Sequence, residues 1–482
     1  MDKSVNSLLK SQAYIGGAWV GTAKMPVVDK ASGEVIGRVP EMGAAETRAA
    51  IDAAAKAFKP WSRLTAKERS KLLRRWHDLI IENAEELARL LTKEQGKPLA
   101  EARGEVVYGA SFVEFFAEEA KRIYGETIPS HKADARIIVQ REPIGVIAAI
   151  TPWNFPVAMI TRKVAPALAA GCTAVIKPAE DTPLCALALA ALAEQAGFPA
   201  GVFNVVTARD PVPVGEVMTS DPRVRLVTFT GSTEVGKILM RQAAGTVKRV
   251  ALELGGNAPF IVFDDADLDR AVAGAMASKF RNAGQTCVCA NRILVQAGVY
   301  EAFAAKLAVE VGKLKIGPGL DHGVTLGPLI NAAAIQKVED HVADAVAYGA
   351  KVVAGGKRAG ASGNFFAPTI LTCVTPQMKV AREETFGPVA PLFRFETEEQ
   401  AIAMANDTPF GLAAYFYTRD LARAFRVGEA LEFGIVGINE GLTSTELAPF
   451  GGMKESGLGR EGSRHGVEEF LEIKYLLVGG LS

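Results

Sequence analysis

Residues 145–150 read Gly-Val-Ile-Ala-Ala-Ile and run directly into Thr151-Pro152-Trp153-Asn154-Phe155-Pro156. An apolar run of this length, bounded by glycine and proline, predicts a strand that is buried on both faces. Further segments of this kind alternate with Ala/Leu-rich helical stretches, with strands at 173–176, 201–206 and 226–229 and helices at 183–197 and 234–243. This alternation predicts βαβ units in which helices cover a parallel sheet.

Two other regions frame this series. Upstream, Thr65-Ala66-Lys67-Glu68 has the spacing of a capping box and opens an amphipathic helical stretch that stops near Gly96 and Pro98. Downstream of residue 253, a second α/β series is predicted, with strands near 259–263 and 292–296 and helices at 266–282 and 299–313. Two separate segments, 135–142 and 469–478, read as edge strands, which usually need a partner.

The composition disfavours several classes of function. The 482 residues are 49 % apolar and 22 % charged, and 54 basic side chains balance 54 acidic ones. This neutrality gives no electrostatic reason to expect nucleic acid or a membrane as a partner. Five scattered cysteines do not form a disulfide framework, and residues 1–6 lack the apolar core of a signal peptide. A reducing, cytoplasmic setting and no metal site are therefore expected.

A thiol and a carboxylate are candidates for covalent chemistry. Cys287 follows Gly284-Gln285-Thr286, a small polar approach in a connection after a predicted helix. Glu253 ends the predicted strand at 249–252, where a buried carboxylate is costly unless it is paired or functional. A thiol can attack a carbonyl, and a carboxylate can accept a proton. From these patterns alone, an inert core cysteine and a salt-bridged structural glutamate stay open as alternatives.

Three turns after predicted strands add further polar groups. Asn154 can offer its side-chain amide to an oxyanion, although holding the turn is the alternative. Lys177 and Glu180, at the carboxyl edge of the sheet, can meet a ribose or can be solvated loop charges. The segment FTGSTEVG at 229–236 offers close backbone approach and a helix N-terminus to phosphate oxygens. Its spacing is neither G-x-G-x-x-G nor that of a P-loop, so the signal is weak alone.

Seven motifs together resemble the aldehyde dehydrogenase superfamily. They are TPWNFP at 151, KPAE at 177, FTGSTEVG at 229, LELGGNAP at 252, GQTCVCAN at 284, EETFGP at 383 and PFGGMKESGLGREG at 449. The resemblance implies an α/β fold with three parts: a Rossmann-type cofactor domain (1–130 and 145–252), an α/β catalytic domain (253–445) and a small oligomerisation β-sheet (131–144 and 466–482). It also implies a homo-oligomer, either a dimer or a tetramer.

The same resemblance assigns roles to individual residues. Cys287 is the nucleophile that forms a thiohemiacetal and then a thioester, Asn154 and the backbone amide of Cys287 form the oxyanion hole, and Glu253 activates water. The expected cofactor is NAD, with NADP possible, because the Glu180 carboxylate would repel a 2′-phosphate. The implied cofactor-binding residues are Thr151, Trp153, Asn154, Lys177, Glu180, Gly231, Ser232, Gly236, Leu254 and Glu384.

Within the superfamily, the chain is most similar to the succinate-semialdehyde dehydrogenases, with the glutarate-semialdehyde enzymes close by and GABA degradation as the implied context. The segments that suggest this are ITRK at 160, FRNAGQTCVCANR at 280, SGNFFAPT at 362, AAYFYTRDL at 413 and EGSRHGVEEFLEIKY at 461. A short aldehyde with a terminal carboxylate needs fixed cations, which Arg162 and Arg281 can supply. An internal salt bridge for Arg162 and a helix-end cation for Arg281 are the alternatives. The resemblance adds Ser444 and Phe450 as substrate contacts.

Cys289 lies two residues after the expected nucleophile, where most of the superfamily has no cysteine. A reversible Cys287–Cys289 disulfide is one hypothesis, and a small buried residue beside the site is the alternative. Three competing functions also stay open. They are a CoA-acylating enzyme, which would generally lack the Glu253 base, a non-catalytic protein on the same scaffold, and an enzyme for another acidic aldehyde.

Overall fold

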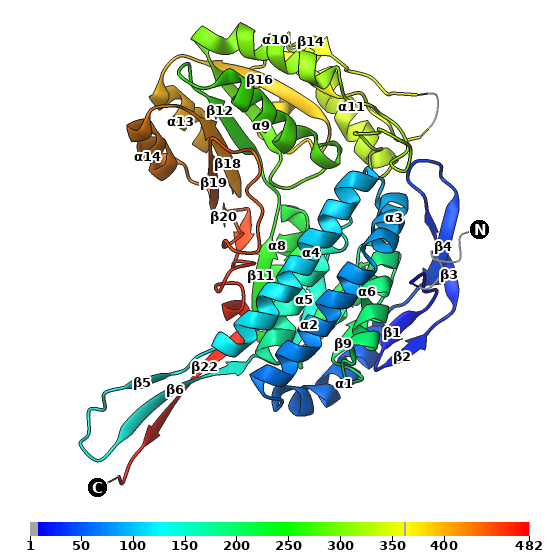
Figure 1. The fold of residues 1–482 in the computed structure, drawn as a ribbon, viewed down its shortest axis with the longest axis vertical. Helices are drawn as coiled ribbons and strands as arrows, with labels where there is room; N and C mark the ends of the chain where they lie inside the picture. Colours follow the sequence, from blue (N-terminus) through cyan, green and yellow to red (C-terminus); the bar gives the residue numbers. More distant parts are fainter. Residues whose placement is uncertain (1–7, 361–362, 482) are drawn as a thin grey trace.

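The computed structural model describes residues 8–360 and 363–481. Residues 1–6, on which the signal-peptide expectation rests, lie outside this range. The chain folds into two α/β units and a small projecting sheet (Figure 1). Among the described residues, no helix is long and apolar enough to cross a membrane, and no three His, Cys, Asp or Glu side chains are arranged to hold a metal ion.

The first unit is built on an eight-stranded sheet in the order β2-β1-β9-β8-β7-β10-β11-β21. Its parallel strands confirm the predicted alternation: β7 (Val146–Ile150), β8 (Thr173–Lys177), β9 (Phe203–Val205), β10 (Val224–Thr230) and β11 (Arg249–Glu253). Antiparallel strands close both edges: β1 (Ala13–Ile15) and β2 (Ala18–Val20) at one, and β21 (Gly457–Leu458) at the other.

The side chains of β7 explain why its apolar run is continuous. Ile147 and Ala149 face one hydrophobic core, and Val146 and Ala148 face the other, because successive side chains of a strand point to opposite faces. The first core is formed with α2 (Ala66–Glu82), α3 (Ala84–Gln95), α4 (Leu99–Glu119), α5 (Ala158–Ala170) and α6 (Pro183–Ala196). The second is formed mainly with α1 (Ala44–Ser62), α7 (Val212–Ser220) and α8 (Thr233–Ala243).

The predicted helical stretch after Thr65 is two helices rather than one. Its start is confirmed, because Thr65 and Glu68 form the reciprocal capping box. Asn83 then separates α2 from α3, and its side-chain amide donates to the Leu79 carbonyl at 2.8 Å. The stretch ends where expected, at Gly96, whose φ of 104° is the left-handed conformation that glycine adopts most easily.

The second unit is built on a seven-stranded sheet in the order β14-β15-β16-β13-β12-β18-β19. Its strands are β12 (Ala258–Val262), β13 (Ala290–Gln296), β14 (Lys351–Ala354), β15 (Thr369–Thr372), β16 (Val389–Phe395), β18 (Ala413–Tyr417) and β19 (Ile435–Ile438). All neighbours are parallel except β14 and β15. The helices are α9 (Leu268–Phe280), α10 (Tyr300–Val311), α11 (Ala332–Ala347), α12 (Lys379–Arg382), α13 (Glu398–Asn406) and α14 (Leu421–Ala430).

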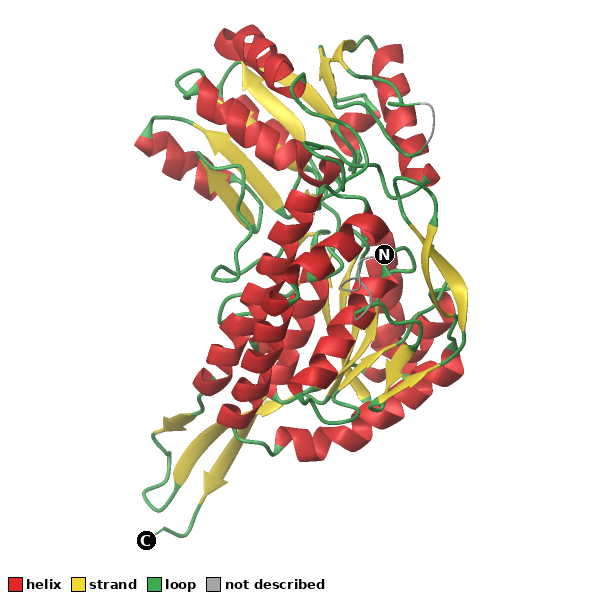
Figure 2. Cartoon of the chain, turned by 45° about the vertical axis from the view of Figure 1, so that its right-hand side comes forward, coloured by secondary structure: helices red, strands yellow, loops and turns green. Residues whose placement is uncertain are grey.

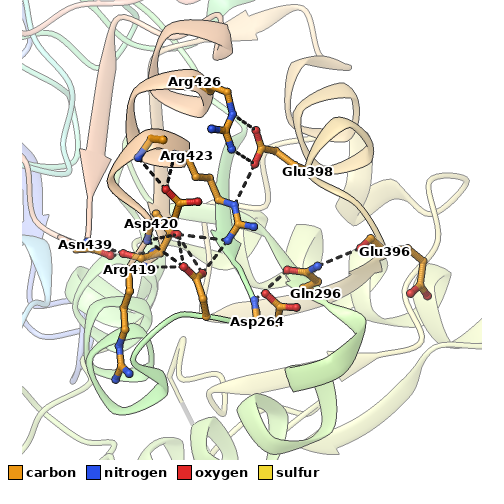
Figure 3. Close-up of polar contacts among 12 residues, drawn as sticks. Asp264, Gln296, Glu396, Glu398, Arg419, Asp420, Arg423, Arg426 and Asn439 are labelled. Atoms are coloured by element: carbon orange, nitrogen blue, oxygen red, sulfur yellow. Dashed lines mark hydrogen bonds and ion pairs between the residues drawn. The ribbon is translucent and has the colours of Figure 1, made fainter.

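An ion-pair cluster on the second unit holds α13 and α14 together (Figure 3). Glu398 accepts from Arg423 at 3.0 Å and from Arg426 at 2.9 Å. Arg423 also donates to Asp265, in the loop after β12, at 2.9 Å. These contacts are structural, because none of the four side chains lines the cavity described below.

The two predicted edge strands pair with each other. They are β6 (Arg136–Pro143) and β22 (Leu471–Val478), which run antiparallel, and β5 (Glu126–Ile128) adds a third strand. β5 thus begins ahead of the predicted segment 131–144. The sheet projects from the body of the molecule and carries the C-terminus near its tip (Figures 1 and 2). Ile473 and Tyr475 on it are 62 % and 61 % exposed, so the sheet leaves apolar surface uncovered in a single chain.

Two short strand pairs complete the fold. They are β3 (Ala23–Val28) with β4 (Val35–Pro40), and β17 (Phe410–Gly411) with β20 (Met453–Lys454).

Candidate active site

A cavity of about 370 Å³ lies between the carboxyl edge of the first sheet and the second unit. Seven of the expected site residues line it: Trp153, Asn154, Gly231, Ser232, Leu254, Cys287 and Glu384. The other lining residues are Pro152, Thr230, Gly255, Ile330, Asn331, Ala333, Ala334, Lys337, Thr385 and Phe386. Residues from turns far apart in the sequence thus meet at one place, as open α/β sheets arrange their ligand sites.

The loop that carries Cys287 begins with an unusual turn after α9. The predicted helix 266–282 ends at Phe280, because Asn282 and Ala283 both have positive φ, at 50° and 54°. Asn282 is held there by distant groups: its N–H donates to Glu101 Oε2 at 2.8 Å, and its Oδ1 accepts from Gln95 Nε2 at 3.0 Å. The turn therefore directs the following loop into the cavity.

Cys287 is partly accessible at the cavity wall. Burial raises the pKa of its thiol to about 12, while the positive charge of Arg162 acts in the opposite direction. This shift favours the protonated thiol over the thiolate, and attack on a carbonyl requires removal of the thiol proton. A Cβ added to Gly256 would lie 2.6 Å from the Cys287 carbonyl oxygen, so the loop can lie this close only against a glycine.

Asn154 lies in the turn between β7 and α5. Its Nδ2 donates to the main-chain oxygen of Gln285 at 3.1 Å, which links the turn to the thiol loop. The carboxamide nitrogen carries a second hydrogen, which is free to donate to an oxyanion in the cavity. Asn154 Oδ1 is buried and accepts no hydrogen bond from the described residues.

Glu253 ends β11, as predicted, and is 4 % exposed. Burial raises the pKa of its carboxyl well above the ordinary value, and the negative charge of Glu461 acts in the same direction. Arg162 and Lys163 oppose this shift. Glu253 Oε2 has no hydrogen-bond partner among the described residues, so this carboxylate is available to a proton donor. A raised pKa makes this carboxylate a stronger base than an ordinary glutamate.

The cofactor-side residues fit a nucleotide. Glu384 Oε1 accepts from the N–H of Gly256 at 3.2 Å, and burial raises the pKa of this carboxyl to about 7. Ser232 caps α8, where its Oγ accepts from the Val235 N–H at 3.3 Å and leaves its own hydrogen to donate. An anion is favoured at such a helix N-terminus.

Two expected cofactor glycines differ in their surroundings. Gly231 lines the cavity, and an added Cβ there would lie 2.3 Å from the Phe229 ring. Gly236 lies inside α8, where an added Cβ would lie 2.4 Å from Leu254. Gly236 does not line the cavity. A glycine is needed at this position because α8 packs closely on Leu254.

Thr151, Lys177 and Glu180 lie outside the cavity wall, at the ends of β7 and β8. The Thr151 N–H donates to the Lys177 carbonyl at 3.1 Å, and Lys177 Nζ pairs with Glu180 at 3.0 Å. Lys177 is buried whereas Glu180 is exposed. The pair thus presents an exposed carboxylate at the edge of the sheet, beyond the cavity.

Arg162 differs from the expectation of a free substrate anchor. Its Nη2 lies 2.7 Å from Glu461 Oε2, and its guanidinium lies 4.0 Å from the centroid of the Phe450 ring. The side chain is 2 % exposed. This is the internal ion pair that the sequence left open as the alternative, formed with a residue 299 positions away.

Arg281, in contrast, has no ion pair or hydrogen bond among the described residues. Its Nε is buried without a partner, and its guanidinium lies 5.5 Å from the centroid of the Phe155 ring. The Tyr108 hydroxyl is buried as well, with Ser444 as its polar neighbour. Burial raises the pKa of Tyr108, against the positive charges of Arg162 and Arg281 and the neighbouring Ser444. Arg281, Tyr108 and Ser444 therefore form a polar group beside the thiol loop.

Some of these residues could not have been found from sequence. Phe386 packs edge to face on Trp153 with ring centroids 5.5 Å apart, and Lys337 reaches the cavity from α11. Tyr108 lies on α4, in a stretch that looks like an ordinary amphipathic helix. A single tyrosine or lysine on a helix gives no local signal of the site that it faces.

Cys289 is buried and does not line the cavity. Its Sγ accepts from Lys279 Nζ at 3.1 Å. The Cys287–Cys289 disulfide therefore stays a prediction that requires Cys289 Sγ to leave Lys279. Counting free thiols after peroxide and again after dithiothreitol tests it, and an unchanged thiol count would contradict it.

Comparison with known proteins identifies relatives across the chain. The model of the aldehyde dehydrogenase family matches residues 19–476. Succinate-semialdehyde dehydrogenase [NADP(+)] of Escherichia coli (strain K12) is 64 % identical over 98 % of this chain and 99 % of its own length. Glutarate-semialdehyde dehydrogenase of Pseudomonas aeruginosa is also 64 % identical, with the same coverage. The crystal structure of an NADP-dependent enzyme of E. coli has a TM-score of 0.97 at 64 % identity and covers 98 % of both chains.

Proposed function

Because the chain belongs to the aldehyde dehydrogenase family, we propose that it oxidises a short aldehyde with a terminal carboxylate to the dicarboxylic acid. Succinate semialdehyde is the first candidate and glutarate semialdehyde the second, since relatives named for each are equally similar to this chain. The observation that carries the proposal is Arg281. It is a guanidinium that has no ion pair within residues 8–360 and 363–481, and it lies six residues before Cys287.

In this proposal Cys287 loses its thiol proton to water, and the thiolate attacks the aldehyde carbon to form a thiohemiacetal. The oxygen of that adduct carries the developing negative charge, which the free N–H of the Asn154 amide and the backbone N–H of Cys287 stabilise. Preorganised donors of this kind are the largest single contribution in many acyl-transfer sites. The positive charge of Arg162 favours deprotonation of the thiol. Among the neighbouring charges, it has the largest effect in lowering the pKa of Cys287.

A nicotinamide cofactor, when bound, supplies the hydride acceptor that turns the adduct into a thioester. Glu384, Ser232 and Trp153 would hold it in the cavity. The fit is physical, because Ser232 and the α8 N-terminus can donate to phosphate oxygens and Glu384 can accept from ribose hydroxyls. Between NAD and NADP, the proposal favours NAD because of the exposed Glu180 carboxylate, although one similar relative is named for NADP.

Glu253 is proposed as the base that activates water to hydrolyse the thioester. Its unpartnered Oε2 and raised pKa support this role. A CoA-acylating reaction is disfavoured by the same observation, because release to CoA needs no water-activating carboxylate. A non-catalytic role is disfavoured because the thiol and the amide line one cavity, and the proposed base, Glu253, immediately precedes Leu254, which lines the same cavity.

Arg281 is proposed to bind the terminal carboxylate of the substrate and so to favour charged over uncharged aldehydes. Steady-state kinetics on succinate semialdehyde, glutarate semialdehyde and butanal, each with NAD and with NADP, measures this directly. Arg281→Ala should lower kcat/KM for the two acidic aldehydes by about 10²-fold, since a charge-assisted contact is worth on the order of 3 kcal/mol, while butanal is little affected. Equal losses on charged and uncharged aldehydes would remove Arg281 as the anchor.

The small sheet formed by β5, β6 and β22 supports a homo-oligomer. Its exposed apolar side chains, Ile473 and Tyr475 among them, need a cover that a second copy of the chain can provide. Light scattering on the purified protein gives the mass, and a monomer at micromolar concentration would contradict this part of the proposal. A cytoplasmic setting is proposed on the five free cysteines.

A further inference from the structure

A buried ion pair lies behind the turn that carries Asn154. Lys97, just after α3, and Glu105, on α4, are 2 % and 3 % exposed, and Lys97 Nζ donates to Glu105 Oε2 at 2.5 Å. Neither residue lines the cavity. Taking two charges out of water costs several kcal/mol per ion, which is offset only when the geometry is good and further hydrogen bonds are made. The remaining contacts of the pair are therefore informative.

The pair holds both ends of segment 154–158. Lys97 Nζ also donates to the main-chain oxygen of Asn154 at 2.8 Å. Glu105 Oε1 accepts from the N–H groups of Val157 at 2.9 Å and Ala158 at 3.3 Å, which are the first free donors of α5. A carboxylate at this position satisfies unpaired N–H groups and interacts favourably with the helix dipole. One ion pair thus fixes the carbonyl before the turn and the amides after it.

Phe155 lies between these two ends. Lys97 Nζ is 3.8 Å from the centroid of its ring, and the Arg281 guanidinium is 5.5 Å from the same centroid. Both cations lie within the range of cation–π attraction. The Lys97 ammonium therefore restrains the side chain after Asn154 as well as the carbonyl of Asn154 itself.

The Asn154 carbonyl also joins the turn to the thiol loop. Asn282 Nδ2 donates to Asn154 O at 3.1 Å and to Gln285 O at 3.2 Å. Gln285 O in turn accepts from Asn154 Nδ2 at 3.1 Å. Asn154 and Cys287 belong to different α/β units, so the distance between oxyanion donor and nucleophile depends on this junction. Small misplacements of such groups are costly to catalysis.

We propose that Lys97, fixed by Glu105, is a positioning residue for oxyanion stabilisation at Cys287. It holds the Asn154 carbonyl and thereby aims the Asn154 side-chain amide at the aldehyde oxygen. Lys97 touches neither substrate nor cofactor, so its effect passes through Asn154. The inference rests on the proposed function only because its test measures aldehyde oxidation. Any aldehyde that the unmodified chain oxidises can be used as the substrate in that test.

A double-mutant cycle tests this coupling. Lys97→Met is made in the wild-type chain and in an Asn154→Ala background, and kcat, KM and the rate of nicotinamide reduction are measured by stopped-flow absorbance. In the wild-type chain we expect kcat to fall about tenfold, with the KM for aldehyde and the affinity for NADH within about twofold. In the Asn154→Ala background the same change should lower kcat less than about twofold, because the group that Lys97 aims is already absent.

Glu94 provides a matched control. It is also fully buried, and it accepts from the N–H groups of Leu184 at 2.9 Å and Cys185 at 2.8 Å at the start of α6, as Glu105 does at α5. No residue of α6 lines the cavity. Glu105→Gln should therefore lower kcat severalfold, whereas Glu94→Gln should leave kcat unchanged. This difference in kcat is expected even if both changes lower the unfolding midpoint.

Two results would overturn the inference. One is the same fold-loss for Lys97→Met in both backgrounds, and the other is an equal loss of kcat for Glu105→Gln and Glu94→Gln. If Lys97→Met does not fold, the Lys97→Met/Glu105→Gln variant, which leaves neither charge buried alone, enters the cycle with the same criterion. Lost discrimination between charged and uncharged aldehydes would concern Arg281 and the substrate assignment, so the two proposals fail separately.

Discussion

The turns after β7 and β8 are neighbours in one sheet, and each leads into a helix whose first N–H groups are bonded by a buried glutamate. Glu105 caps the helix after β7, and Glu94 caps the helix after β8. Only the first cap has a lysine at hydrogen-bond distance. Glu94 accepts from the N–H groups of Leu184 and Cys185 and from the Cys185 thiol, and burial raises the pKa of its carboxyl to about 7.

This difference matches what the two turns carry. The turn after β7 holds Asn154, which must keep a fixed orientation beside Cys287. The turn after β8 holds Glu180, which is exposed and pairs with Lys177. A carboxylate cap is sufficient to start a helix, whereas an added buried ammonium also fixes the carbonyl that precedes it. If Asn154 is the oxyanion donor, the added lysine lies at the one of the two turns where a fixed carbonyl matters for catalysis.

The largest expected effect separates the two turns directly. Asn154→Ala removes the oxyanion donor and should lower kcat by about 10²–10³-fold, whereas Glu180→Ala should change kcat less than about threefold. Initial rates at saturating aldehyde and cofactor measure both variants. Similar kcat losses in both would mean that the turn after β7 has no special catalytic part.

A second prediction concerns the stability of the chain as a function of pH. The pKa of Glu94 is raised from 4.5 to about 7 in the folded chain, so the folded form binds more protons at this site than the unfolded form between these values. Its contribution to stability is present below about pH 4.5 and decreases as pH rises toward 7. Glu94→Gln should remove this decrease, which is on the order of 3 kcal/mol. Urea unfolding midpoints from pH 5 to about pH 7.5 measure it, and parallel curves for both chains would contradict it.

The smallest expected effect lies in the turn after β8. Glu180→Ser removes an exposed negative charge where a 2′-phosphate would approach, so the ratio of kcat/KM for NADP over NAD should rise by about tenfold. Steady-state kinetics with each cofactor at fixed aldehyde gives the ratio, and Glu234→Ser, on the exposed first turn of α8, controls for a general change in charge. An unchanged ratio would assign cofactor choice to another residue.

Local patterns predicted the five parallel strands of the first sheet but not its edge strands β1, β2 and β21. The parallel strands β7 and β8 are buried on both faces and read as continuous apolar runs. The patterns failed at Asn83 and at Asn282, where a helix stops without proline or glycine. At Asn282 the cause is tertiary, since Glu101 and Gln95 hold a positive φ that no local preference selects. The start of β5 was missed because its three residues are too few to show a period.

For the site, the motifs were sufficient to name Cys287, Asn154 and Glu253, and the structure places Cys287 and Asn154 on the cavity wall with Glu253 buried at the end of β11. They could not separate Arg162 from Arg281. Both are arginines near a motif, and only the folded chain shows that Arg162 is ion-paired with Glu461, which also pairs with Lys163.

By itself, then, the sequence predicted the alternation of strands and helices around the site, and its motifs singled out the proposed nucleophile, amide and base. The tertiary structure alone decided which charges are paired. Lys97 meets Asn154 57 positions away, and Arg162 meets Glu461 299 positions away. Such contacts are set by how helices pack on a sheet, and the pattern of one segment does not show which distant residue each of its side chains will meet.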